Sequence, residues 1–381
     1  MFDYVFKRKR TWIGVFFLDL IGSLFFIFKA KTVPKPVRKI LVIRLDHIGD
    51  LVLSTPFIKK IRSIYPAAEI DLLCDSKYAE LMKNEKEIDR VLTLEGHWLD
   101  RKNKASFKSI IDCVKKIKEG QYDLGFDLRG DIRSIFYFLL IPGVKFRVAY
   151  GVRGGGFMLN HNPVYPAHIH QAEKNTHLIS TLFYREEKLL FPELTVGVEE
   201  QKKMENRLIE MGKDPNKKIV IAHLGAGYAS KQWPIERFVK VLEAIVDSGN
   251  FQVCLVGTKN ELELTEDFLT RPNIYNFIGK TTPLELLGLT SLGDIFIGND
   301  SGPAHLSSAL NIPTLTIFSG TNRHQEWRPL GKQTKIIYKD VECSPCEEQV
   351  CPLKHHHCME WITEEEVLET FMDLARDSVL V

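Results

Sequence analysis

The sequence predicts an α/β protein with two doubly wound parallel-sheet domains in tandem, facing a cleft. Short apolar runs of strand length alternate with segments of helical spacing from Lys39 to Leu128, and the alternation starts again at Lys218. Strands that alternate with helices favour parallel pairing with right-handed crossovers. Several of the apolar runs end in glycine-rich or charged turns, and ligands bind such sheets at the carboxyl ends of their strands. We therefore expect a ligand site where these turns gather.

The composition is that of an ordinary globular protein. The chain has 381 residues, of which 44% are hydrophobic and 26% charged, and its formal net charge is +2. A chain of this length has room for two or three domains with large cores. The charge is close to neutral and no basic–aromatic pattern appears, so nucleic acid is not an expected partner.

Residues 1–37 differ from the rest of the chain. The basic run Lys7–Arg10 precedes an apolar, phenylalanine-rich stretch from Trp12 to Phe28, and more basic residues follow. A transmembrane helix needs about 20 apolar residues, and Asp19 lies near the middle of this stretch, where a bilayer disfavours a carboxylate. No good cleavage site supports a signal peptide. We expect a helix in the membrane interface with its basic flanks on anionic lipid, and a spanning or a domain-packed helix as the alternatives.

The first domain is expected over residues 38–200. Strands are predicted at 39–44, 69–74, 90–94 and 122–128, and helices at 51–65, 77–84 and 107–119. Residues 143–215 are harder to interpret. Within them we expect loops at 151–156 and 160–171 that could border a cleft, and one helix at 199–211.

The second domain is expected over residues 201–340. Strands are predicted at 218–223, 251–256, 275–279, 294–297 and 313–318, and helices at 235–248, 261–269, 283–290 and from Leu306 onward. A last segment, residues 341–381, contains a cysteine-rich stretch and a helix at 364–375.

Two glycine-rich strand ends in the second domain are candidate phosphate sites. Gly225-Ala226-Gly227 follows one predicted strand, and Ser301-Gly302 opens a helix for which Ser301 or Asp300 is the expected cap. Backbone N–H groups and a partial positive charge at a helix N-terminus favour a phosphate. Lys231 would neutralise a diphosphate, and Glu261 would accept hydrogen bonds from ribose hydroxyls. The alternatives without a ligand are a capped turn, a solvated lysine and an ordinary first-turn glutamate.

The first domain offers a candidate base and candidate acceptor contacts. Asp50 begins a predicted helix, where its carboxylate could take a proton from an attacking hydroxyl, and helix capping is the alternative. Asp46 and His47 lie in the same turn. Arg129 and Arg133 follow another predicted strand and could bind an acidic acceptor, or serve only the structure.

Other short motifs argue against several enzyme classes. Gly225-Ala226-Gly227 lacks the third glycine of a dinucleotide fingerprint, and the sequence has no Walker lysine motif. A Gly-x-Ser-x-Gly elbow and a His-Glu-x-x-His zinc motif are also missing.

Three stretches together point to one family. The first runs from Ile43 to Pro56 (IRLDHIGDLVLSTP), the second joins His223–Gly227 to Lys231–Pro234, and the third is Gly298–His305 (GNDSGPAH). In order and spacing they resemble the signatures of the ADP-heptose:lipopolysaccharide heptosyltransferases, glycosyltransferase family 9. The resemblance covers the chain from about Arg38 to Leu330.

The resemblance implies a GT-B fold and an inverting, metal-independent glycosyltransferase that needs no cofactor for catalysis. It would move heptose or a related sugar from a nucleotide diphosphate such as ADP-heptose to a lipopolysaccharide-core or similar surface-glycan acceptor. Asp50 would be the general base, Glu261 would meet the ribose, and Thr281 and Thr282 would lie near the nucleobase. The full expected donor set is Gly225, Gly227, Lys231, Gly257, Glu261, Thr281, Thr282, Asp300, Ser301, Gly302 and His305.

The same resemblance implies a lipid-linked saccharide acceptor and a cytoplasmic protein, peripheral on the inner face of the cytoplasmic membrane. Two other functions stay open. A nucleotide-sugar 2-epimerase of the same fold would need acid–base groups around the sugar ring and no acceptor. A non-catalytic glycan-binding protein would not need Asp50.

Four of the seven cysteines cluster near the C-terminus. Cys343, Cys346, Cys351 and Cys358 form a C-x2-C-x4-C-x6-C run that contains three consecutive histidines. These are ligand types of a structural zinc ion, and the first pair has the usual spacing. Free thiols or redox pairs are the alternative, and disulfides are less expected in a cytosolic protein.

Overall fold

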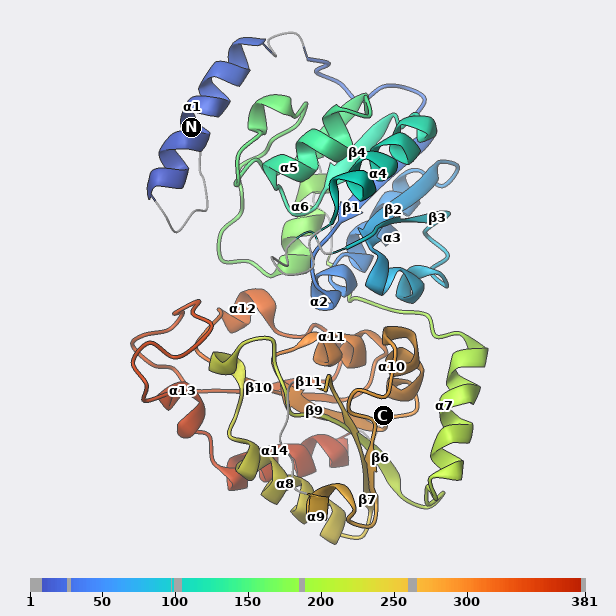
Figure 1. The fold of residues 1–381 in the computed structure, drawn as a ribbon, viewed down its shortest axis with the longest axis vertical. Helices are drawn as coiled ribbons and strands as arrows, with labels where there is room; N and C mark the ends of the chain where they lie inside the picture. The colour runs from blue at the N-terminus through green and yellow to red at the C-terminus, as the bar shows by residue number, and fades with distance from the viewer. Residues whose placement is uncertain are drawn as a thin grey trace. The chain divides into compact units, whose positions relative to one another are not determined.

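The computed structural model describes residues 9–25, 29–96, 98, 105–184, 189–259 and 266–377. The chain divides into two compact units, Met1–Leu190 and Phe191–Val381. Each unit is built on one sheet whose described strand pairs are all parallel (Figure 1). The prediction of two doubly wound α/β domains is confirmed.

The first unit contains a five-stranded sheet in the order β3-β2-β1-β4-β5. Its strands are β1 (Lys39–Arg44), β2 (Glu69–Asp75), β3 (Arg90–Leu94), β4 (Leu124–Asp127) and β5 (Phe146–Ala149). The strand order reverses between β1 and β4, which pair directly. The turns that follow these two strands therefore flank the position at which such sheets bind ligands.

Helices cover both faces of the first sheet. The helices of this unit are α1 (Lys9–Phe25), α2 (Ile48–Val52), α3 (Thr55–Ile64), α4 (Phe107–Gly120), α5 (Ile132–Ser134) and α6 (Gln171–Phe183), with 3-10 helices η1 (Ser76–Met82) and η3 (Gly156–Met158) and the π-helix η2 (Ile135–Leu140). Leu41 of β1 belongs to a core cluster with Ile117 of α4 and Phe138 of η2. On the opposite face, Phe57 of α3 packs edge-on against Phe126 of β4, with 5.0 Å between ring centroids. Both faces of the strands are thus buried, as their continuous apolar runs indicate.

Two predicted helices of the first unit differ in the structure. The helix expected at 51–65 is divided into α2 and α3, and the helix expected at 77–84 is the 3-10 helix η1. In the region without clear periodicity, sequence analysis missed β5 and α6. Helix α6 buries Lys174, Asn175 and Thr176, so its inward face does not show the apolar spacing of an amphipathic helix.

The second unit contains a six-stranded sheet in the order β11-β10-β9-β6-β7-β8. Its strands are β6 (Lys218–His223), β7 (Phe251–Val256), β8 (Ile274–Asn276), β9 (Ile295–Asn299), β10 (Thr314–Phe318) and β11 (Thr334–Tyr338). The order reverses between β6 and β9, as in the doubly wound sheets that bind dinucleotides. β11 is a partly exposed edge strand, which explains why its apolar run was missed.

The helices of the second unit bury the two faces of its sheet against different partners. They are α7 (Val198–Glu210), α8 (Ile235–Asp247), α9 (Glu266–Leu269), α10 (Pro283–Thr290), α11 (Gly302–Ala309), α12 (His324–Trp327), α13 (His357–Glu360) and α14 (Glu364–Asp377), with the 3-10 helix η4 (Ala229–Lys231). Val220 shares a core cluster with Phe238 of α8 and Phe371 of α14. Ile221, the next residue, shares another with Leu208 of α7 and Leu289 of α10. For the helix expected at 261–269, the described part begins at Glu266.

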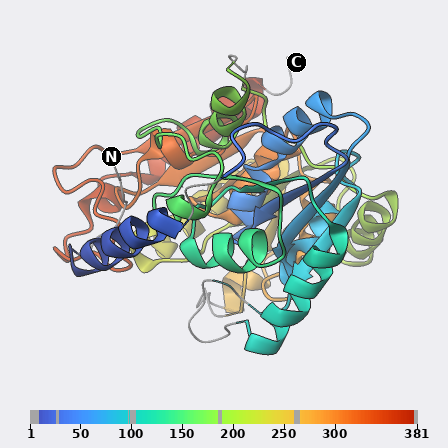
Figure 2. The same ribbon diagram turned by 90° about the horizontal axis from the view of Figure 1, so that it is seen from above.

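Helix α1 lies at the edge of the first unit and packs against the loop around η3 (Figures 1 and 2). Asp19 is fully buried and accepts a 2.8 Å hydrogen bond from the backbone N–H of Gly155. Lys29 donates to the carbonyl oxygens of Phe157 and Leu159, at 2.6 and 2.8 Å. Other α1 side chains face outward, and these are Phe17, Leu18, Leu20, Ile21 and Leu24. Among the described residues, no helix has the length and apolar character needed to cross a bilayer.

Candidate functional site

At the switch point of the second sheet, the turns after β6 and β9 are tied to each other. His223 lies opposite Gly298, and a Cβ at Gly298 would lie 2.5 Å from the carbonyl oxygen of His223, so only glycine fits there. The fully buried Asn299 side chain donates to the carbonyl of Leu224 at 2.6 Å and accepts from the N–H of Trp233 at 3.1 Å. These bonds hold the glycine-rich turns after β6 and β9 in a fixed position relative to each other.

Lys231 and Asp300 form an ion pair across this switch point. The Nζ of Lys231 lies 2.6 Å from Oδ2 of Asp300, and the two side chains are only 16% and 5% exposed. The pair joins η4 to the end of β9. Asp300, which the sequence left open as a cap or a sugar contact, is thus the direct partner of the predicted diphosphate lysine.

The expectation that Ser301 or Asp300 caps α11 through its side chain is wrong. Ser301 occupies the N-cap position, but its hydroxyl makes no cap hydrogen bond. It donates to the carbonyl of Asn299 at 3.0 Å and also bonds Nδ1 of His223 at 2.9 Å. The first turn of α11, which begins at Gly302, therefore carries no side-chain cap, and its N–H groups suit an anionic ligand.

The other predicted donor residues lie around the same end of the sheet, with one exception. Gly225 is buried, Gly227 is exposed with open space around its Cα, and His305 is buried in α11. Gly257 follows β7 and accepts a hydrogen bond from the N–H of Gly279 at 2.7 Å. Glu261 lies outside the described residues.

The threonines expected near the nucleobase lie at the start of α10. Thr282 is its N-cap and forms a capping box with Glu285, so the Thr282 hydroxyl already accepts a hydrogen bond from the Glu285 N–H. Thr281 precedes it and is partly exposed.

In the first unit, Arg44 organises the turn after β1. This guanidinium is 4% exposed. It forms an ion pair with Asp46, with Nε 3.0 Å from Oδ2, and donates a 2.5 Å hydrogen bond to Asp50. It also donates to the carbonyl of Leu128 at 2.8 Å, which links the turns after β1 and β4. The N-cap of α2 is the exposed His47, so Asp50 does not cap this helix. Sequence analysis missed Arg44, although its place at a strand end is visible.

The turn after β4 gathers positive charge beside Asp46. Arg129 contacts the carboxylate of Asp46, and burial together with the guanidinium of Arg153 lowers the pKa of Arg129 to about 9. Gly130 at φ +71° makes this turn possible, because a Cβ there would lie 1.9 Å from the carbonyl oxygen of Tyr150. A partly buried guanidinium with neighbouring arginines favours an anionic ligand, because an anion would offset their mutual repulsion.

Arg133 is held more tightly than the sequence suggests. It forms two hydrogen bonds with Asp131, at 3.0 and 2.9 Å, and its guanidinium carbon lies 5.0 Å from the ring centroid of Trp98. The side chain is still half exposed. It can therefore meet a ligand without leaving Asp131.

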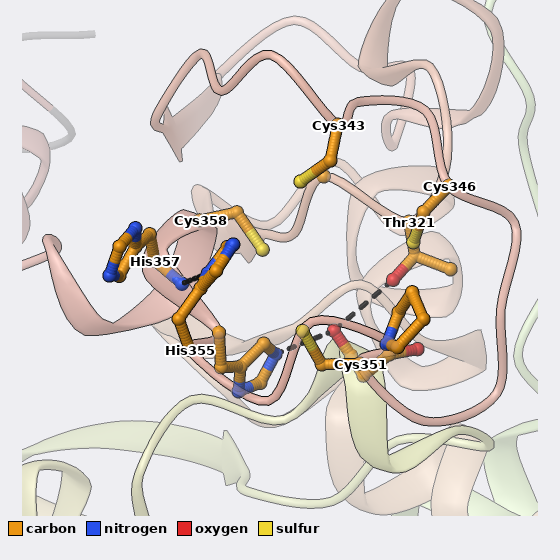
Figure 3. Close-up of a pocket in the computed structure, with 11 residues that line it drawn as sticks. Thr321, Cys343, Cys346, Cys351, His355, His357 and Cys358 are labelled. Carbon is orange, nitrogen blue, oxygen red and sulfur yellow. Dashed lines mark hydrogen bonds between the residues drawn. The ribbon is translucent and has the colours of Figure 1, made fainter.

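The four clustered cysteines line one pocket (Figure 3). Burial raises the pKa of Cys358, and neighbouring Cys343, Cys346 and Cys351 raise it further. Within the described part of the chain, no three His, Cys, Asp or Glu side chains are already arranged to hold a metal ion. The thiols thus gather around one space but are not preformed as a ligand set.

Comparison with known proteins places these features in a family. The family model described as glycosyltransferase family 9 (heptosyltransferase) matches residues 110–357, which is more than half of the chain. The chain belongs to glycosyltransferase family 9. Both its family and its two-sheet fold therefore agree with the resemblance of the three sequence motifs.

Individual members of family 9 match over different lengths. Lipooligosaccharide heptosyltransferase 2 of Campylobacter jejuni subsp. jejuni serotype O:2 is 36% identical over 171 residues, 43% of this chain and 53% of that protein. The chain thus spans about half the length of that curated relative. Lipopolysaccharide heptosyltransferase 3 of Escherichia coli K12 is 26% identical over 75% of this chain and 83% of its own length.

A solved family 9 structure shares the fold. The structure of E. coli ADP-heptose lps heptosyltransferase II has a TM-score of 0.72 and 20% identity, and covers 89% of this chain and 99% of the other. The GT-B fold class predicted from the sequence is confirmed.

Proposed function

We propose that this protein transfers heptose or a related sugar from a nucleotide diphosphate donor such as ADP-heptose to a lipid-linked saccharide of the lipopolysaccharide-core type. The Lys231–Asp300 pair at the switch point of the second sheet carries the proposal. Family membership and the names of the relatives support the choice of sugar and acceptor.

On the donor side, the leaving group is a nucleoside diphosphate. As the bond from the sugar carbon to the diphosphate oxygen breaks, negative charge grows on the phosphates. Lys231 and the uncapped N-terminus of α11 supply positive charge for it, and fixed donors of this kind stabilise a transition state strongly. Asp300 keeps the Lys231 ammonium in place until the donor arrives.

On the acceptor side, Asp50 takes the proton from the attacking hydroxyl. Arg44 bonds Oδ1 of Asp50 and thereby orients the carboxylate, while the second oxygen receives the proton. Attack on the face opposite to the leaving diphosphate inverts the sugar carbon. Arg129 and Arg133 bind acidic groups of the acceptor, and Asp46 holds Arg44 and Arg129 in position.

The test compares Asp50→Asn and Lys231→Ala. We expect Asp50→Asn to lower kcat by about a hundredfold or more and to leave ADP affinity unchanged, because general-base catalysis contributes about that much. We expect Lys231→Ala to weaken ADP binding measured by calorimetry. Normal turnover of Asp50→Asn would contradict the base assignment.

The control for the alternative enzyme class is incubation with the nucleotide sugar alone. A 2-epimerase would convert the donor without an acceptor, whereas the proposed transferase would leave the sugar configuration unchanged.

Two further parts of the proposal concern the ends of the chain. The apolar outer face of α1 and the basic residues that flank it in the sequence support peripheral binding to the inner face of the cytoplasmic membrane. The four cysteines that line one pocket support a structural zinc ion, because thiolates are the ligands that structural zinc sites use. Neither α1 nor the cysteine cluster takes part in the transfer step.

A further inference from the structure

The turn that carries Lys231 is held by the cysteine-rich segment, residues 341–358. Ser230, which precedes Lys231, is 3% exposed and is bonded through all its polar groups. Its N–H donates to the carbonyl of Gln349 at 3.1 Å, and its hydroxyl donates to the carbonyl of Glu348 at 2.5 Å. Its own carbonyl accepts from Nε2 of His356 at 2.9 Å and from the hydroxyl of Thr321 at 3.1 Å.

The same segment also holds the turn after β10. The N–H of Cys346 donates to the carbonyl of Gly320 at 3.1 Å, and the N–H of Glu347 donates to the carbonyl of Thr321 at 2.9 Å. Ser230, Gly320 and Thr321 line the pocket that the four cysteines surround (Figure 3). The cysteine-rich segment therefore links the turns after β6 and β10, on either side of the β9 end that carries Asp300.

A lysine side chain is flexible, so the backbone from which it starts decides where its ammonium group can bind. Residues 229–231 form only one turn of 3-10 helix, which by itself does not fix that backbone. The hydrogen bonds of Ser230 hold the backbone that the short turn alone does not fix. A displacement of about 1 Å weakens a positioned contact markedly. These bonds therefore affect how well the Lys231 ammonium group is placed to bind the donor diphosphate.

We propose that the cysteine-rich segment positions Lys231 for the donor diphosphate, with His356 acting through the carbonyl of Ser230. The proposal rests on the proposed function, in which Lys231 binds the diphosphate. His356 is a positioning residue and does not touch the donor. The segment thus serves the donor site as well as the stability of the second unit.

The test measures ADP affinity by calorimetry in His356→Ala and His356→Gln. We expect His356→Ala to weaken ADP binding roughly five- to tenfold, as the loss of one buried hydrogen bond does. Glutamine keeps an N–H donor of similar reach and should restore affinity to within about twofold. His357→Ala is the matched control, since this neighbouring histidine stacks on His355 and Trp361 and should leave ADP affinity unchanged.

A double-mutant cycle separates positioning from general damage. If His356 acts through Lys231, then His356→Ala in the Lys231→Ala background causes no further loss of ADP affinity. Additive losses, or unchanged affinity in His356→Ala alone, would overturn the inference. Thr321→Val removes the other donor to the Ser230 carbonyl and provides a second variant, expected to act in the same direction, where His356→Ala does not fold.

The outcome also distinguishes this inference from the proposed function. No ADP binding by the wild-type protein, or unchanged affinity in Lys231→Ala, contradicts the proposed donor site itself and this inference with it. A loss in Lys231→Ala without a loss in His356→Ala contradicts only the positioning role.

Discussion

At the scale of single residues, Asp127 connects the sheet of the first unit to its arginine-rich turn. It ends β4, is fully buried, and accepts hydrogen bonds from the N–H groups of Arg129 and Gly130 at 2.9 and 3.0 Å. The hydroxyl of Ser134 also bonds it. Burial nevertheless raises the pKa of Asp127 to about 6, so this carboxyl group titrates in an accessible range.

The raised pKa predicts the direction of a pH effect on stability. The folded state binds the proton of Asp127 more tightly than the unfolded state, in which the pKa is near 3.8. The contribution of Asp127 to the free energy of unfolding is therefore full below pH 3.8 and is lost as the pH rises to about 6. Asp127→Asn does not titrate, so its stability relative to wild type should increase over this range and then level off. Urea unfolding at several pH values measures the difference, and a constant difference would contradict the prediction.

The sequence motifs predict Asp50 and Lys231 as site residues but do not reveal the residues that hold them. Asn299, Ser230 and His356 bond partners that are distant in the chain, and Arg44 joins the turns after β1 and β4 through the carbonyl of Leu128. Which of these segments lie side by side depends on strand order. Strand order does not follow from local spacing. The capping of α11 was mispredicted for a related reason, because the Ser301 hydroxyl bonds β9 and the end of β6 instead of its own helix.

At the scale of elements, strands were predicted most reliably. Buried parallel strands such as β1 and β7 show continuous apolar runs, because both faces of their sheet are covered by helices. Elements whose side chains are polar or half exposed, such as α6 and β11, do not show such runs. The division of the 51–65 helix into α2 and α3 depends on the turn at Leu53–Ser54 and was not apparent from spacing.

The cysteine-rich segment yields a prediction at this scale. Protein purified without chelator should contain about one zinc ion per chain, because four thiols surround one pocket. The double substitution Cys343→Ser/Cys346→Ser should abolish that content in metal analysis. Cys113→Ala, at a buried cysteine of the first unit, should retain it. A wild-type stoichiometry near zero would exclude the zinc site.

At the scale of the whole molecule, the proposed membrane binding rests on α1. Its outward apolar side chains include Phe17, Leu20 and Leu24, which are 55%, 46% and 68% exposed. Burying a side chain of this size in lipid contributes about 1.5–3 kcal/mol. The spacing of these residues places them along one stripe of the helix, on which a bilayer surface would fit.

Replacing Phe17, Leu20 and Leu24 by serine should release the protein from vesicles that contain anionic lipid. Removing residues 1–30 should do the same and leave transfer to a detergent-solubilised acceptor intact. Phe107→Ser changes another exposed phenylalanine, outside α1, and this variant should still bind. Vesicle sedimentation measures the bound fraction, and persistent binding of the triple variant would show that α1 is not the anchor.

The buried contact between Asp19 and Gly155 ties α1 to the loop around Gly155. The loop that Asp19 holds also carries Arg153, whose backbone forms a β-bridge with Asp131, near Arg129 and Arg133. With α1 bound at the lipid surface, as in the proposed function, this contact would therefore set the distance of these arginines from the headgroups. The saccharide between the lipid and the reacting sugar would then have to be long enough to span the distance from the headgroups to these arginines. Loosening the Asp19 contact would then alter which acceptor lengths are used, while the chemistry of transfer stayed the same.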